Sequence, residues 1–260
     1  GLHVIVAREF AKFLRQRERL LSSLVRPMLW LLVFATGLHD LLGVSIIPPY
    51  RTYTPYQEYI LPGLLGIVVL FQSMQSALSV VYDREVGVMR VMLVTPLPRP
   101  YLLFAKTLAA TALGVLQSAI FLAAAALFSI TLPLQTVVLV VPALVLSGFM
   151  LGSIGLVVSV YTRQIENFAG MMNFVIFPMF FLSSALYPLW KLREAGADAI
   201  YWIALFNPFT HAVELIRFAA YGQFNPLSLA VVAGVGGAAF LLAVRGYNPL
   251  IGTFGQIKRD

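Results

Sequence analysis

Cysteine and charge are what this sequence most clearly lacks. No cysteine occurs among 260 residues, which excludes disulfides and any metal or thiol site built from cysteine. Charged residues make up 11% of the chain, whereas an ordinary soluble domain carries about 25%. Hydrophobic residues make up 60%, and the mean hydropathy is +0.86. The composition therefore predicts a membrane protein.

The sequence also lacks the motifs of ATP-binding and hydrolytic enzymes. The phosphate loop G-x-x-x-x-G-K-[ST] places a lysine directly after a glycine. None of the four lysines follows a glycine: Lys12, Lys106, Lys191 and Lys258. The three histidines are scattered and no H-E-x-x-H occurs, which argues against an enzyme embedded in the membrane. We expect neither a catalytic residue nor a bound metal in this chain.

Uncharged runs predict six transmembrane helices and hence an all-α polytopic fold. About 20 apolar residues cross a bilayer as a helix. The stretch from Thr107 to Thr162 carries no charge over 56 residues, which is too long for one crossing, and TLPL at 131–134 divides it. The predicted spans are 20–38, 59–82, 107–130, 135–161, 167–190 and 226–244. All of them belong to one transmembrane domain that covers residues 1–260.

The basic residues orient these spans. With both termini in the cytoplasm, only four of the 18 Lys and Arg residues fall outside: Arg51, Lys191, Arg193 and Arg217. The other 14 lie on the cytoplasmic side, as the positive-inside tendency requires. This bias accounts for the net charge of +7, so we expect no nucleic-acid partner.

Two segments outside the spans are expected to lie along the membrane. Residues 1–19 place Phe10 and Leu14 on one helical face and Arg8 and Arg15 on the other. That pattern suits an interface helix, or a helix packed on a soluble partner. Residues 191–217 are too polar to span and too apolar for a free loop, so we expect short re-entrant helices in the outer leaflet.

The cytoplasmic segment DREVGVMRVMLVTPLPRP, at 83–100, is rich in charge and proline. Val86, Met89 and Leu93 lie at helical spacing, and Pro96 and Pro98 end the helix. A short amphipathic helix with charged flanks either docks on a soluble protein or touches lipid alone. The residues by themselves leave both interpretations open.

Three motifs, in order, resemble those of ABC-2 type transporter permeases. The E-x-G…T-P…K pattern of their first cytoplasmic loop is matched by Glu85, Gly87, Thr95, Pro96 and Lys106. NPFTHAVELIR at 207–217 is similar to the motif before their last span, and YILPGLL at 59–65 resembles the start of their second span. With six spans and an amphipathic N-terminal helix, the resemblance covers the whole chain.

The resemblance implies the permease subunit of an ATP-driven exporter. Segment 83–100 would be a coupling helix seated on an ATPase subunit, through Glu85, Gly87, Arg90, Thr95, Pro96 and Arg99. ATP and Mg would be bound by that partner, and a homodimer of permeases would join two ATPase copies. The complex would lie in a bacterial-type inner (plasma) membrane. It would export an amphipathic, lipid-like or drug-like substrate, or alternatively a lipid-linked saccharide or polysaccharide.

Polar and aromatic residues inside the predicted spans are candidates for a translocation path at the dimer interface. They are Gln72, Gln75, Asn173 and Phe177. Hydrogen bonding between helices explains the three amides equally well.

Small residues line one face of the fourth predicted span and favour close helix packing. They are Gly148, Gly152, Gly155 and Ser159. Gly234, Gly236 and Gly237 in the sixth span are interpreted in the same way.

The outer motif comprises Asn207, Pro208, His211, Glu214 and Arg217. His211 and Glu214 are three residues apart and could hold a metal on one helical face. No third ligand lies nearby in the sequence. A charge cluster that stabilises the short helices is therefore the favoured interpretation.

A stand-alone channel or secondary transporter is the main alternative. Such proteins usually carry buried ionisable residues for coupling, and the interiors of the predicted spans show none. The sequence also shows no inverted repeat.

Overall fold

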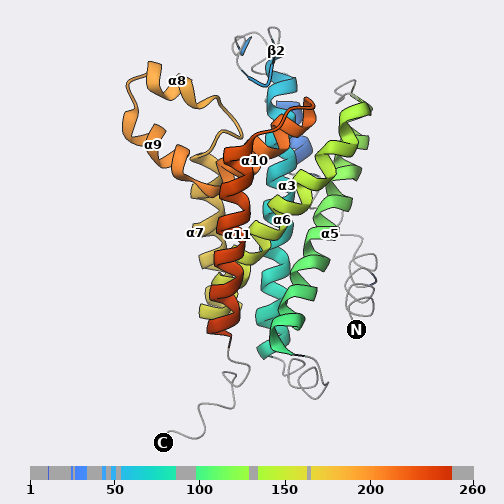
Figure 1. Ribbon diagram of the computed structural model, residues 1–260, viewed down its shortest axis with the longest axis vertical. Coiled ribbons are helices and arrows are strands. Elements are labelled where there is room, and N and C mark those ends of the chain that lie inside the picture. Colours follow the sequence, from blue (N-terminus) through green and yellow to red (C-terminus); the bar gives the residue numbers. More distant parts are fainter. Residues whose placement is uncertain are drawn as a thin grey trace, which may run out of the picture.

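The computed structural model describes residues 27–33, 54–85, 98–128, 134–162 and 165–247, together with residues 11, 25, 43–44 and 48–50. Long helices run side by side and form a bundle (Figure 1). They are α3 (Tyr56–Glu85), α5 (Arg99–Ala126), α6 (Leu134–Tyr161), α7 (Ile165–Phe181) and α11 (Pro226–Gly246).

Shorter elements gather where α3 begins, at the top of Figure 1. They are α8 (Leu189–Glu194), α9 (Asp198–Phe206), α10 (Pro208–Ala220), β1 (Gly43–Val44) and β2 (Thr54–Pro55). The two strands pair antiparallel, with Val44 opposite Thr54, and the sequence analysis did not predict them. We call this the upper end of the bundle. The lower end is where α3 ends and α5 begins.

Apolar helices of sufficient length make the chain an all-α polytopic membrane protein. Four helical segments are long and apolar enough to cross a membrane: Glu58–Asp83, Pro100–Ala126, Thr136–Tyr161 and Pro226–Gly246. Helices α9 and α10 pass the same test only as a pair, and they are bent by 72° to each other. The described residues thus supply four or five candidate spans.

Three predicted spans coincide with helices. Spans 59–82, 135–161 and 226–244 lie within α3, α6 and α11. Of span 20–38, residues 27–33 are helical. The rest of that span, and the predicted interface helix apart from Ala11, lie outside the described residues.

The predicted third span, 107–130, is wrong at both ends. Helix α5 begins at Arg99 and ends at Ala126. Pro98 is extended and Pro100 stands in the first turn, where a missing backbone N–H leaves no hydrogen bond unmade. The sequence analysis took Lys106 as a boundary because charge is costly in lipid. In the structure this lysine is buried inside the helix beside a carboxylate.

The predicted fifth span, 167–190, is wrong at its C-terminal end, because α7 stops at Phe181. Side chains from α3 take up carbonyls of the turn that follows. The Tyr59 hydroxyl donates to the Ser184 carbonyl at 2.9 Å, and the Tyr56 hydroxyl donates to the Leu186 carbonyl at 2.6 Å. These carbonyls are therefore satisfied without a further helical turn. Apolar periodicity could not reveal partners so remote in sequence.

Helix α6 packs closely on its neighbours through its predicted small-residue face. A Cβ placed on Gly152 would lie 2.9 Å from the Thr107 side chain of α5. One placed on Gly155 would lie 3.0 Å from Ala77 of α3. The packing interpretation of this face is confirmed. In α11 it holds for Gly236 only, since Gly234 and Gly237 have nothing within 4 Å.

We predict that Gly155→Leu destabilises the bundle, because a larger side chain must push α3 and α6 apart. Overpacking of this kind costs about 1–3 kcal/mol. The matched control is Gly234→Leu, which enters open space and should leave stability unchanged within about 0.5 kcal/mol. Thermal unfolding in detergent measures both. Equal losses in the two variants would contradict the close packing of α3 on α6.

Candidate functional site

The lower end of the bundle carries the predicted coupling segment. Residues 86–97, with Gly87, Arg90, Thr95 and Pro96, lie outside the described residues. Their flanks are described: Glu85 is the last residue of α3 and Arg99 the first of α5. The segment is therefore attached at both ends to long apolar helices that pack on each other.

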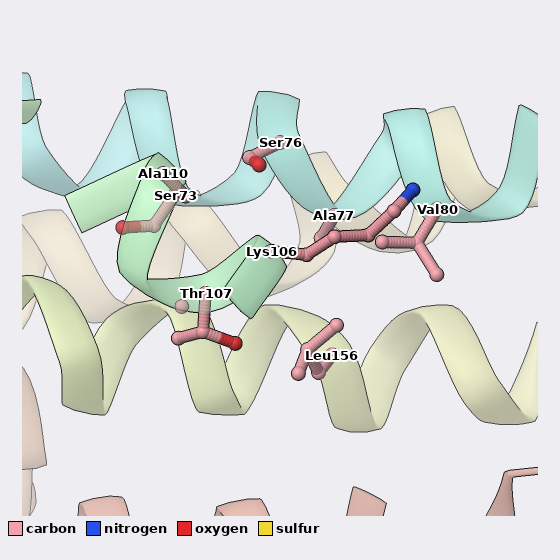
Figure 2. A pocket seen from close by; sticks show the side chains of 9 residues that line it. Ser73, Ser76, Ala77, Val80, Lys106, Thr107, Ala110 and Leu156 are labelled. Carbon is pink, nitrogen blue, oxygen red and sulfur yellow. The ribbon is translucent and has the colours of Figure 1, made fainter. Parts of the chain in front are cut away.

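A buried ion pair joins α3 and α5 directly behind that segment. The Lys106 ammonium donates to the Asp83 carboxylate, and the two side chains are 5% and 4% exposed. Figure 2 shows the lysine stretched along α3, past Ala77 toward Val80. The ion pair therefore connects α3 with α5, the two helices that flank the predicted coupling segment.

A small polar pocket adjoins this ion pair. Ser73, Ser76 and Thr107 are among its lining residues, and its volume of about 10 Å³ is close to what one water needs. The pocket is too small for a substrate. It can at most hold a water molecule beside Lys106.

The sequence pattern did not predict this ion pair. Asp83 and Lys106 lie just outside the predicted spans 59–82 and 107–130, whose interiors hold no ionisable residue, so the predicted bounds hid the pair. A usable signal was present: an acid in the last turn of one span and a lysine in the first turns of the next. Antiparallel neighbours bring such positions to the same depth, and burial then requires that they pair.

We predict that either single change, Asp83→Leu or Lys106→Met, lowers the free energy of unfolding by about 3–5 kcal/mol. Each change would remove one member of a buried ion pair and keep the charge of the other. The double variant should recover most of that loss, because no lone charge remains. Arg245→Met, at an exposed position of α11, is the control and should have little effect. Unfolding in detergent gives the values. A double variant as unstable as the sum of both singles would contradict a buried pair.

The outer motif lies at the upper end and forms the bend between α9 and α10. The Asn207 side chain accepts from the Phe209 backbone N–H at 3.0 Å and donates to the Met179 carbonyl of α7 at 2.9 Å. Pro208 starts α10, and the Thr210 hydroxyl donates to the Ala204 carbonyl at 2.6 Å. The motif residues thus fix the two short helices against each other and against the end of α7.

Arg217 is the centre of a buried network at this end. It is 2% exposed and donates to the Ser184 carbonyl at 2.8 Å, while Glu214 neutralises its charge. Its guanidinium lies 4.1 Å from the centre of the Tyr59 ring of α3. Of the predicted charge cluster, Glu214 and Arg217 form an ion pair. Within the described part of the chain, no three His, Asp or Glu residues are close enough to hold a metal ion.

The candidate path residues are not gathered at one place. Gln72 is buried and accepts from Gln117 of α5 at 3.1 Å, which is an interhelical hydrogen bond. Gln75 is half-buried one turn further along α3. Asn173 and Phe177 lie on the exposed face of α7, where Phe177 stacks on Phe181 with ring centres 6.0 Å apart.

The long apolar helices define a polytopic membrane protein. The chain matches the ABC-2 type transporter family over residues 1–221, and it belongs to that family. It is therefore the transmembrane permease of an ABC transporter, a family whose members work with an ABC ATPase.

Relatives with curated names agree with this assignment. The ycf38 protein of Porphyra purpurea, named as a transport permease, is 26% identical over 220 residues, which cover 84% of this chain and 72% of the relative. The ycf38 protein of Cyanophora paradoxa is 28% identical over 230 residues, covering 84% and 73%. Nodulation protein J of Rhizobium leguminosarum bv. viciae is 34% identical over 82 residues, covering 32% and 30%.

Proposed function

We propose that this permease is driven by ATP through segment 83–100, and that it exports its substrate. The observation that carries the proposal is the Asp83–Lys106 pair, which joins α3 close to Glu85 with α5 about two helical turns beyond Arg99. A displacement of the segment by the ATPase would be transmitted to α3 through Glu85 and to α5 through Arg99. Because the two helices are tied behind these residues, they move together rather than apart.

The lower end would then face the cytoplasm, together with both termini, in a bacterial-type inner membrane. Two ATPase subunits would bind ATP and Mg. Each would transmit its movement to one copy of this chain in a homodimer. Glu85, Gly87, Arg90, Thr95, Pro96 and Arg99 would form the contact with each ATPase. The chain itself contributes no ATP-binding loop.

The exposed face of α7 is the proposed side of the translocation path. Met171, Phe174 and Phe177 are 45%, 78% and 50% exposed, with Asn173 among them. A broad aromatic and thioether face with one amide suits an amphipathic, lipid-like or drug-like substrate. A lipid-linked saccharide or polysaccharide is the alternative. Gln75, half-buried on α3, is a further polar candidate, and the side chain of Gln72 is engaged by Gln117.

A secondary transporter is the second candidate function, because the bundle buries two ion pairs, Asp83–Lys106 and Glu214–Arg217. Both lie toward the ends of the bundle. Coupling sites of secondary transporters lie near the bilayer midplane. Each charge is also matched by its partner: Asp83–Lys106 joins α3 to α5, and Glu214–Arg217 lies within α10.

The deciding experiment is purification of the tagged chain from its native cell, followed by an ATPase assay of the bound proteins. An ATPase should co-purify with the wild type. Glu85→Ala combined with Arg90→Ala should reduce its recovery at least about tenfold, since each charged hydrogen bond contributes about 1.5–3 kcal/mol.

The control removes the same two charge types at the opposite end: Glu194→Ala combined with Arg193→Ala, in α8. Recovery of the ATPase should then equal that of the wild type. If nothing that hydrolyses ATP co-purifies, and transport in vesicles proceeds with an ion gradient alone, the exporter proposal fails in favour of a secondary transporter.

A further inference from the structure

The residues that follow α7 form a buried turn at the upper end of the bundle. Residues 182–188, which we call the outer turn, contain neither helix nor strand. Ser184 and Ala185 are 2% and 0% exposed. Irregular backbone at membrane depth is tolerated only where protein or a cavity shields it, because lipid offers no hydrogen bonds. The carbonyls of the outer turn must therefore find donors elsewhere in the protein.

Side chains from α3 and α10 supply those donors. The Tyr59 hydroxyl of α3 donates to the Ser184 carbonyl at 2.9 Å, and Arg217 of α10 donates to the same carbonyl at 2.8 Å. The Tyr56 hydroxyl donates to the Leu186 carbonyl at 2.6 Å. Burial raises the pKa of Tyr56 to about 12, so this hydroxyl keeps its proton at neutral pH. The outer turn is thus joined to two helices through side chains.

Bonds of this kind allow the outer turn to move without unfolding a helix. A neutral hydrogen bond contributes little net free energy, and water at the outer face can replace it. A cavity of about 280 Å³ adjoins the turn at Pro188, and the aromatic residues Tyr50, Tyr59 and Trp190 also line it. The cavity gives the turn room to change its position.

The outer turn begins where the exposed face of α7 ends. Phe181, the last residue of α7, is 43% exposed and stacks on Phe177 of the proposed path. The side chains that follow it are buried. On the other side of the turn, a Cβ on Gly63 of α3 would lie only 2.2 Å from the Ala185 carbonyl oxygen. A shift of α3 must therefore either move the turn or release it.

We propose that the outer turn closes the translocation path at its outer end, and that Tyr56 and Tyr59 are positioning residues that keep it closed. When α3 moves, the two hydroxyls withdraw and the turn moves toward the cavity. The inference rests on the proposed export cycle for the force that moves α3. The closure by the two hydroxyls is measurable without ATP, so the two proposals can fail separately.

The test measures how readily water reaches the outer turn. Ser184→Cys places one thiol there, in a chain that has no cysteine of its own. The Ser184 hydroxyl has no hydrogen-bond partner among the described residues, so the exchange removes no bond. Leu182→Cys, half-buried in the same turn, is a second reporter. The full chain, in nanodiscs with its co-purified ATPase, is labelled with a charged, membrane-impermeant methanethiosulfonate, with and without ATP and Mg. The mass of this chain gives its labelling rate.

Tyr59→Phe keeps the ring against Arg217 and removes only the hydroxyl. It should raise the labelling rate without ATP about fivefold, in line with the loss of one neutral hydrogen bond. It should leave the rate with ATP unchanged, because the turn is then already open. Tyr56→Phe should act in the same way. The matched control is Tyr187→Phe, since the Tyr187 hydroxyl donates to the Phe181 carbonyl from within the turn itself. This control should label as slowly as the parent.

Two results without ATP would overturn the proposal: the same labelling rate in Tyr59→Phe and the parent, or an equal rise in Tyr59→Phe and Tyr187→Phe. Where ATP speeds labelling of the parent, a further rise in Tyr59→Phe with ATP would overturn it as well, since a bundle that is merely loosened behaves in that way. If Tyr59→Phe speeds labelling but ATP has no effect on the parent, the closure stands and the ATP-driven cycle fails.

Discussion

A charge buried within a bilayer needs an opposite charge in contact with it, and helix α3 takes part in one such pair at its lower end and contacts another at its upper end. At the lower end its own Asp83 pairs with Lys106 of α5. At the upper end Arg217, paired with Glu214, lies over the ring of Tyr59. Separating α3 from α5 would break the Asp83–Lys106 pair, and separating it from α10 would remove the Tyr59 ring from Arg217. The helix therefore has one fixed place in the bundle.

Close backbone packing makes α3 a continuous connection between these two ends. A Cβ on Gly63 would overlap the Ala185 carbonyl oxygen, so only glycine lets the helix approach the turn after α7. Further down, the glycines of α6 bring that helix against Ala77 of α3 and Thr107 of α5. Interiors packed this tightly move as units rather than deform. A displacement at the coupling segment would thus reach the upper end with its aromatic cavity.

The sequence was most informative where an uncharged run by itself predicts a helix, and least informative where distant segments meet. The uncharged runs 59–82, 135–161 and 226–244 lie within the helices α3, α6 and α11, because about 20 apolar residues in a row favour a helix that can cross a bilayer. The end of α7 was missed, since Tyr56 and Tyr59 satisfy its turn from 125 or more residues away. Lys106 was misplaced because its burial depends on Asp83 of another helix. The charge cluster around Arg217 was predicted from the spacing of its residues along the chain. The contact of Arg217 with the Tyr59 ring of α3 was not predicted.

The absence of cysteine offers a direct test of the link between the coupling segment and α3. Tyr82→Cys, at a position 51% exposed near the lower end of α3, can carry one spin label per protomer without background labelling. Electron–electron distances between the labels would be measured in the assembled transporter with and without ATP. The account predicts a distance change on ATP binding that disappears when Lys106→Met is added. The same change with and without Lys106, or no change in either, would contradict the role assigned to the ion pair.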